Sequence, residues 1–223
     1  LGNVAVEADA SLTSLKFHDG TLGIADDFFH NRKDKLTSIQ LPSTLLYIGE
    51  KAFMEGSFTT ITLPDRLEGI GNEAFRMSKL KSISFPTSLK SIGESAFAET
   101  LIENVLIPNH IKEIGGWAFY SIQTLKSVFF DVEHPTGRNI FQDCDNLTEA
   151  IIGANVTKIP IRTFWSCQNL EKAEFGSNIN TIEESAFEGC ISLKNIDLPA
   201  SLLTIGVSAF SNCDSLREVV FPE

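Results

Sequence analysis

A phenylalanine that recurs at an almost constant interval is the feature of this chain that most constrains its fold. The pair Ala-Phe occurs six times, and Phe141 and Phe164 fill the gap in the series. The series runs through Phe53, Phe75, Phe97, Phe119, Phe141, Phe164, Phe187 and Phe210, and Phe29 extends it backward. A period of about 22–23 residues is typical of chains that stack short units, because one unit cannot bury its apolar side alone.

Each unit follows the pattern L-x-x-I-x-[LFI]-P-x-x-L-x-x-I-G-x-x-A-F, and the copy from Leu80 to Phe97 is the cleanest. The apolar residues at the fourth and sixth places alternate, which predicts a short strand with one buried face. Proline ends that strand because it has no N–H to donate. The Ile-Gly pair then turns the chain. The segment Gly-Glu-Ser-Ala-Phe suits one to two turns of helix, with Ala and Phe facing inward.

Composition narrows the possible functions. The 17 phenylalanines are nearly all explained by the Ala-Phe column and the strands, so they do not indicate an aromatic cofactor site. The net charge of -11 would repel a phosphate backbone, which argues against nucleic-acid binding. A mean hydropathy of +0.04 argues against disorder. No apolar run approaches the roughly 18 residues that a membrane span needs.

The strand pattern, with proline after the strand and the I-G-x-x-A-F-x-x-C half, resembles the BspA-like (Treponema-type) subfamily of leucine-rich repeat proteins. The resemblance runs from about Leu12 to Phe221. It implies an α/β solenoid: a right-handed leucine-rich repeat horseshoe with one parallel sheet on the concave face and short helices or turns on the convex side. It also implies a bacterial cell-surface or secreted protein of the adhesin type, which binds host or partner-cell proteins.

We expect a single leucine-rich repeat domain over residues 1–223. It comprises an irregular N-terminal capping repeat (1–35), eight repeats of about 22–23 residues (36–215) and a truncated last repeat (216–223). The expected strands lie near residues 13–17, 37–41, 59–63, 81–85, 103–107, 126–130, 148–152, 171–175, 194–198 and 217–221. Because the chain begins at Leu1 and stops within the pattern, we expect it to be part of a longer protein.

Two units in the middle depart from the pattern. The unit that begins at Leu125 has Asp131-Val-Glu-His-Pro135-Thr-Gly137-Arg where the others have Ile-Gly, and the next unit has Ile159-Pro160 there. We therefore expect the solenoid to be irregular at this point on its non-strand side.

Residues that could support catalysis or bind a metal are scattered. The histidines His18, His30, His110 and His134 fall in different repeat columns, so stacking does not bring them together. No metal-binding, nucleophile or phosphate-loop motif occurs. Asp143 and Asp145 flank Cys144 and could be a pair of calcium ligands, but turn and helix-end carboxylates explain them better. We expect no cofactor, no metal and no enzymatic activity.

A column of outward strand residues is the predicted binding site. It reads Lys16, Gln40, Thr62, Ser84, Leu106, Phe129, Ile151, Glu174, Asp197 and Val220. Leu106, Phe129 and Ile151 are large, apolar and adjacent, and exposed patches of this kind tend to be interaction sites. With Glu174, Lys126 and Glu149 they make the predicted site on the concave face.

Three interpretations of this patch stay open. It binds a partner, it packs against another copy, or the irregular fifth unit covers it. Phe130 is the alternative outward residue to Phe129, because that unit is short.

Two other sets of side chains stand out. Cys144, Cys167, Cys190 and Cys213 recur with the period of the repeat, each at the third position after a column Phe. Stacking puts them in a ladder with parallel Cβ vectors, which does not suit a disulfide, so we predict four reduced, buried thiols. Trp117 and Trp165 lie beside the Phe column, and we expect them to pack against neighbouring units.

The sequence therefore predicts a binding module that takes a protein or glycan ligand on its concave face, for example a host extracellular-matrix protein. The alternative is a structural spacer or accessory module that presents another domain of a larger protein. We expect no nucleic-acid partner and no membrane-spanning segment in this chain.

Overall fold

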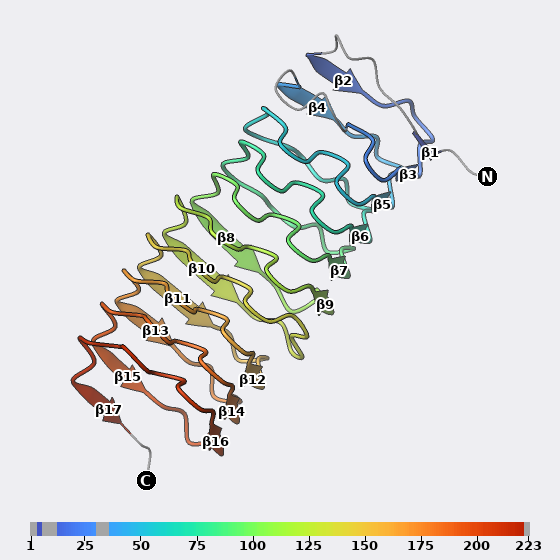
Figure 1. The fold of residues 1–223 in the computed structure, drawn as a ribbon. Coiled ribbons are helices and arrows are strands. Elements are labelled where there is room, and N and C mark those ends of the chain that lie inside the picture. The colour runs from blue at the N-terminus through green and yellow to red at the C-terminus, as the bar shows by residue number, and fades with distance from the viewer. Residues whose placement is uncertain (1–3, 6–12, 30–35, 221–223) are drawn as a thin grey trace.

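A computed structural model describes residues 4–5, 13–29 and 36–220 of the chain. They form coils stacked along one axis, with the two ends of the chain at opposite ends of the stack (Figure 1). Each regular coil brings one strand to a first face, the strand face, and a two-residue strand to a second face. The curvature expected of a horseshoe stays a prediction.

The strand face consists of parallel strands, which pair in repeat order within two separate sheets. The strands are β2 (Ser14–Lys16), β4 (Ser38–Gln40), β8 (Asn104–Ile107), β10 (Ser127–Phe130), β11 (Glu149–Ile152), β13 (Lys172–Glu174), β15 (Asn195–Asp197) and β17 (Glu218–Val220). β2 and β4 form one sheet, and β8, β10, β11, β13, β15 and β17 form another. Eight of the expected strand positions are confirmed, and the last residue expected there, Phe221, lies outside the described residues.

The prediction of strands at 59–63 and 81–85 is wrong, since neither segment is a strand. Lys81 N donates to Thr59 O at 2.9 Å and Glu103 N donates to Lys81 O at 3.2 Å, but residues 61–63 and 83–85 make no backbone hydrogen bonds between coils. The coil that contains segment 59–63 also differs from its neighbours in the core. Phe58 stands where neighbouring units have leucine, and its ring packs edge-on against Phe53 and Phe75 at 6.2 Å.

A second set of short strands, which the sequence did not predict, is built by the Ile-Gly half of each unit. It contains β1 (Val4–Ala5), β3 (Gly23–Ile24), β5 (Tyr47–Ile48), β6 (Gly69–Ile70), β7 (Ser91–Ile92), β9 (Glu113–Ile114), β12 (Lys158–Ile159), β14 (Thr181–Ile182) and β16 (Thr204–Ile205). In five of these units a glycine follows the isoleucine and lets the coils approach closely. A Cβ on Gly93 would lie 2.5 Å from the backbone N of Asn72 in the preceding coil.

This second ladder is interrupted between β9 and β12. Pro135 occupies the place that Glu113 holds one coil earlier, and proline has no N–H to donate to a ladder. Pro160 likewise replaces the glycine of the next unit. The predicted irregularity on the non-strand side is thereby confirmed.

The predicted helical turns around the column Phe are wrong: the described ranges contain turns there and no helix. Residues two before and two after the column Phe have positive φ, as at Lys51 (52°) and Glu55 (59°), and such residues break a right-handed helix. Every second backbone N–H of these turns therefore points along the axis of the stack, toward the next coil. Phe53 N donates to Ala74 O of the next coil at 2.8 Å, whereas Met54 N donates within its own turn.

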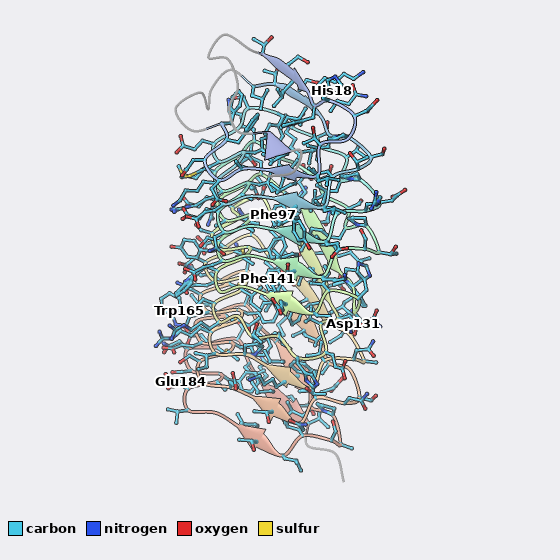
Figure 2. All side chains as sticks on the ribbon, turned by 90° about the vertical axis from the view of Figure 1, so that its right-hand side faces the viewer. His18, Phe97, Asp131, Phe141, Trp165 and Glu184 are labelled. Atoms are coloured by element: carbon cyan, nitrogen blue, oxygen red, sulfur yellow. The ribbon has the colours of Figure 1, made fainter. Side chains whose placement is uncertain are left out.

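Stacked phenylalanine rings fill the centre of the molecule, as the sequence predicted. The rings from Phe53 to Phe210 follow one another at centroid distances of 5.1–5.7 Å, with planes inclined by 6–23°. Figure 2 shows Phe97 and Phe141 inside the stack. Apolar strand residues and the isoleucines of the second sheet surround these rings and complete one continuous core.

The four cysteines are buried and unpaired, as predicted. Each thiol donates to the carbonyl oxygen of the column Phe one coil earlier. The pairs are Cys144 with Phe119 (3.2 Å), Cys167 with Phe141 (3.1 Å), Cys190 with Phe164 (3.2 Å) and Cys213 with Phe187 (3.2 Å). Burial raises the pKa of the Cys144 thiol to about 12 and that of Cys213 to about 11, so both stay protonated at neutral pH.

Thiol titration should therefore find close to no reactive cysteine in the native protein and four after denaturation without reductant. The thiolate is the reactive form, and burial both suppresses it and blocks the reagent. Ellman's reagent added before and after guanidinium chloride measures both numbers. Two or no free thiols after denaturation would show that disulfides form and that the ladder geometry is wrong.

Candidate functional site

Leu106, Phe129 and Ile151 lie side by side on three neighbouring strands of the strand face. Phe129 pairs with Leu106 on one side and with Ile151 on the other. Phe129 and Ile151 are half-buried, and 58% of Leu106 is exposed. We call these three residues the strand-face patch.

Strand alternation explains which side chains form this patch. Successive side chains of a strand point to opposite faces, so burying Val128 and Phe130 turns Phe129 outward. Phe130 is fully buried, which settles the choice between Phe129 and Phe130 in favour of Phe129. The exposure of Leu106 also shows that the irregular fifth unit does not cover it, so that interpretation is wrong.

The charged residues of the predicted site lie around the patch. Glu174 follows Ile151 in the same column, and Glu149 precedes it on β11. Lys172 Nζ lies 3.2 Å from Glu149 Oε1 and also contacts Glu174. These two carboxylates raise the pKa of the Lys172 ammonium, with Glu174 the larger cause.

On the other side, Lys126 Nζ lies 2.8 Å from Glu103 Oε2. The hydrogen bond from Lys126 lowers the pKa of the Glu103 carboxyl. Solvent screens exposed ion pairs of this kind and makes them weak, so a partner can rearrange them at little cost. An apolar centre with an adaptable charged rim is the usual anatomy of a protein interface.

Apart from Val220 on the last strand, the column is apolar only at this patch. Thr62 and Ser84 precede it, and Glu174 and Asp197 follow it. Since neighbouring strands lie about 4.8 Å apart, the patch spans roughly 10 Å, which suits two or three apolar side chains of a partner.

Three other exposed apolar residues have a different origin. Leu203 (85% exposed), Ile205 (40%) and Val207 (78%) belong to the last described coil, where no further described coil covers them. The strand-face patch lies between paired strands on both sides, so its exposure is not an effect of the end of the stack.

A shallow groove of about 660 Å³ lies where the strand ladder is interrupted after β4. It is lined by polar and apolar side chains, among them Gln40, Thr44, Thr62 and Arg66. Sequence reasoning missed it because the pattern at 59–63 reads as an ordinary strand.

The described part of the chain holds no group of three or more His, Cys, Asp or Glu residues placed to bind a metal. His110 Nε2 lies 3.0 Å from Pro86 O, while His18 and His134 lie in other coils. His30 falls outside the described residues. Asp143 Oδ2 accepts a hydrogen bond from Gln142, and burial is the main cause of the raised pKa of Asp145. No helix that could cross a membrane was found in the described ranges either.

Comparison with known proteins identifies what the chain is similar to. A family model described as the BspA type leucine rich repeat region matches six copies over residues 2–131 and 135–223. The break between the two matched ranges falls in the irregular unit before Pro135. A comparison with the curated proteins finds no match.

Solved structures show the same fold. A leucine-rich repeat protein from Bacteroides ovatus is 28% identical with a TM-score of 0.88, over 95% of this chain and 55% of that one. The pneumococcal vaccine antigen PcpA is 23% identical with a TM-score of 0.59, over 93% and 61%. The Treponema pallidum leucine-rich repeat protein is 22% identical with a TM-score of 0.51, over 81% and 78%. The chain thus spans little more than half the length of the first two.

Proposed function

The chain belongs to the family of BspA-type leucine-rich repeat proteins, and we propose on this basis that it is a non-enzymatic protein-binding module of a bacterial surface or secreted protein. The proposed contact surface is the strand-face patch, with Lys126, Glu149 and Glu174 at its edge. The partner is a protein that offers apolar side chains, such as a host extracellular-matrix protein.

One observation carries this proposal: the solenoid exposes large apolar side chains in a column that its other units fill mostly with polar ones. Leu106 is 58% exposed although Thr62 and Ser84 show that polar residues suit the same position. Leaving a large apolar side chain in water brings no stability, whereas covering it with a partner does.

The charge of the surroundings defines the partner further. Lys126 and Lys172 are already paired with glutamates, whereas Asp197 has no ion pair among the described residues. The chain also carries a net charge of -11. We therefore expect a partner with an apolar anchor and basic residues directed toward β13 and β15, since complementary charge speeds association and favours the correct register.

A surface or secreted location is part of this proposal. It is supported by the family and by the printed description of PcpA as a vaccine antigen, which applies to that protein. The net charge of -11 argues against a nucleic-acid partner, which agrees with a surface or secreted location.

A structural spacer is the second candidate function. Backbone hydrogen bonds of the strand face, of the second sheet and of the turns around the column Phe join the coils, and where one of the two sheets is interrupted the other bonds continue. Together with the continuous ring stack, they make a rod suited to holding another domain at a distance. This candidate predicts that no partner depends on the strand-face patch.

A pull-down separates the two candidates. The immobilised protein is incubated with a panel of extracellular-matrix proteins and compared with Leu106→Glu and with the control Thr62→Glu. Both substitutions add one charge to an exposed position of the same column, but only the first lies in the patch. We expect the original chain and Thr62→Glu to retain a partner that Leu106→Glu loses.

Equal retention by all three chains would refute binding through the patch. Light scattering adds a further outcome: a dimer that Leu106→Glu dissociates would identify a second copy as the occupant, which also contradicts the proposal.

A further inference from the structure

A second cluster of unusual side chains lies on the outside of the turns around the column Phe, which we call the turn face. Both tryptophans of the chain and one of its two tyrosines are there: Trp117, Tyr120 and Trp165. All three are half-buried. Figure 2 shows Trp165 at the edge of the stack, with Phe97 and Phe141 inside.

Within three consecutive coils, the rings lie on the first and the third: Trp117 and Tyr120 share one coil, and Trp165 lies two coils further on. Trp117 lies two residues before its column Phe, and Asn139 and Arg162 hold the same place in the next two coils. Tyr120 lies one residue after its column Phe, followed in that place by Gln142 and Trp165. Hydrogen bonds join the coils here, from Ser121 N to Gln142 O at 2.8 Å and from Asp143 N to Trp165 O at 2.9 Å.

The fold does not require aromatic residues at these positions. Other coils place Ser95, Ser185 and Ser208 where Trp117 stands, and Ala98 where Trp165 stands. Trp117 has a φ of 55°, and the residues at the same place in other coils, such as Ser95 and Asn139, share this positive φ, so the backbone does not call for a tryptophan there.

The polar groups between the rings are held in place by one another. Asn139 is 4% exposed and donates to the side-chain oxygen of Gln142, which in turn donates to Asp143 Oδ2 at 3.0 Å. The guanidinium of Arg138 lies 5.6 Å from the centre of the Trp117 ring, which confirms that this tryptophan packs against the next coil.

The charges of this cluster nearly balance, in contrast to the acidic chain as a whole. Arg138 and Arg162 are offset by Asp143 and by Glu184, whose Oε1 lies 3.8 Å from Arg162 Nη2. A ligand of this surface therefore gains little from carrying charge. It gains from a flat apolar side and from groups that both donate and accept hydrogen bonds.

We propose that Trp117, Tyr120 and Trp165 bind a neutral glycan together with Gln142, which lies between them and is held in place by the buried Asn139. Sugar rings carry C–H groups on their faces, which pack on aromatic rings, and hydroxyls that donate and accept hydrogen bonds. Amide and carboxylate side chains meet both needs, and the amphipathic rings of Tyr and Trp suit a surface that is partly wet. This site is separate from the strand-face patch and does not depend on it.

The tryptophans are also the natural reporters of this site. Since the chain has only two and both belong to the cluster, a glycan that binds there changes the tryptophan emission of the protein. A partner that binds the strand-face patch leaves that emission unchanged.

The test is a microarray of neutral oligosaccharides, probed with the labelled protein and with three variants. Trp165→Ala and Trp117→Ser introduce residues that the chain itself uses at the same repeat positions, so the fold should tolerate them. Tyr47→Ala removes an aromatic ring of the second sheet that is 53% exposed and serves as the control. Circular dichroism and melting temperature verify that every variant is folded.

We expect the original chain and Tyr47→Ala to bind the same glycans, and Trp165→Ala to lose at least about tenfold in apparent affinity for them. Titration of each bound glycan should change the tryptophan emission of the original chain. The absence of any bound glycan, or equal binding by a folded Trp165→Ala, would overturn the proposal. The proposal would also be overturned if a protein partner changed the tryptophan emission and no glycan did. Since Leu106→Glu leaves this cluster intact, its outcome does not affect this test.

Discussion

Replacing Phe97 by alanine is expected to lower the free energy of unfolding by about 3–5 kcal/mol, as is usual for a buried aromatic residue. Its ring is fully buried and stacks on Phe75 and on Phe119, each at 5.3 Å. Phe85 packs edge-on against it at 5.8 Å. The substitution leaves a cavity between rings that belong to different coils, and the surrounding backbone ladders prevent the coils from collapsing into it.

Denaturant unfolding, followed by circular dichroism, measures this loss. Because each coil contacts only its neighbours, the single transition of the original chain is expected to split as the two halves of the stack decouple. Tyr47→Ala is the control, since its ring is mostly exposed and its loss should cost about 0.5 kcal/mol or less. A loss below about 1 kcal/mol for Phe97→Ala would mean that the column does not form the core.

Phe130→Glu should prevent folding, whereas Phe129→Glu, one residue earlier, should leave the fold intact. Phe130 is fully buried and its ring lies 5.9 Å from that of Phe141, so a glutamate there would place a charge in the core without a partner. Phe129 faces outward between Leu106 and Ile151, where a carboxylate stays hydrated.

Circular dichroism and thermal melting distinguish the two variants. We expect no cooperative transition for Phe130→Glu and a melting temperature within a few degrees of the original for Phe129→Glu. The opposite result would show that the strand β10 is shifted by one residue, because a shift of one exchanges its two faces. Two folded variants would contradict the burial of Phe130.

The repeat made much of the fold predictable. A side chain that returns once in every repeat must occupy equivalent places in successive coils, so the inward Phe column follows from the sequence alone. The same reasoning placed the cysteines in a buried ladder. Alternation within L-x-x-I-x-L located the strands, apart from the segments at 59–63 and 81–85.

The turns could not be predicted in this way, because their structure depends on the next coil. Segments such as Gly93-Glu-Ser-Ala-Phe97 suit a helix locally. In the structure Phe97 N instead donates to Ala118 O at 2.8 Å, and Ser95 adopts a φ of 53° to make this possible. No glycine marks that positive φ, so the segment carries no local sign of it. The second sheet could not be predicted for the same reason: its two-residue strands form only by pairing with the neighbouring coils.

The candidate site was predicted in part. The outward column followed from alternation, but the choice between Phe129 and Phe130 required the pairing with Leu106 and Ile151. The turn-face cluster was missed because Trp117 and Trp165 lie two repeats apart and occupy different places in the repeat. Aligning the residues that flank the column Phe over three coils would have brought them together.

The affinity of Phe129→Glu for the protein retained in the pull-down tests the proposed function most directly. Isothermal titration calorimetry gives the dissociation constant for the original chain, for this variant and for Thr62→Glu. A large apolar residue at the centre of an interface costs about 2 kcal/mol or more when it is lost, so we expect Phe129→Glu to weaken binding at least about 30-fold. Thr62→Glu should stay within about threefold of the original. Unchanged affinity in a correctly folded Phe129→Glu would contradict binding through the strand-face patch.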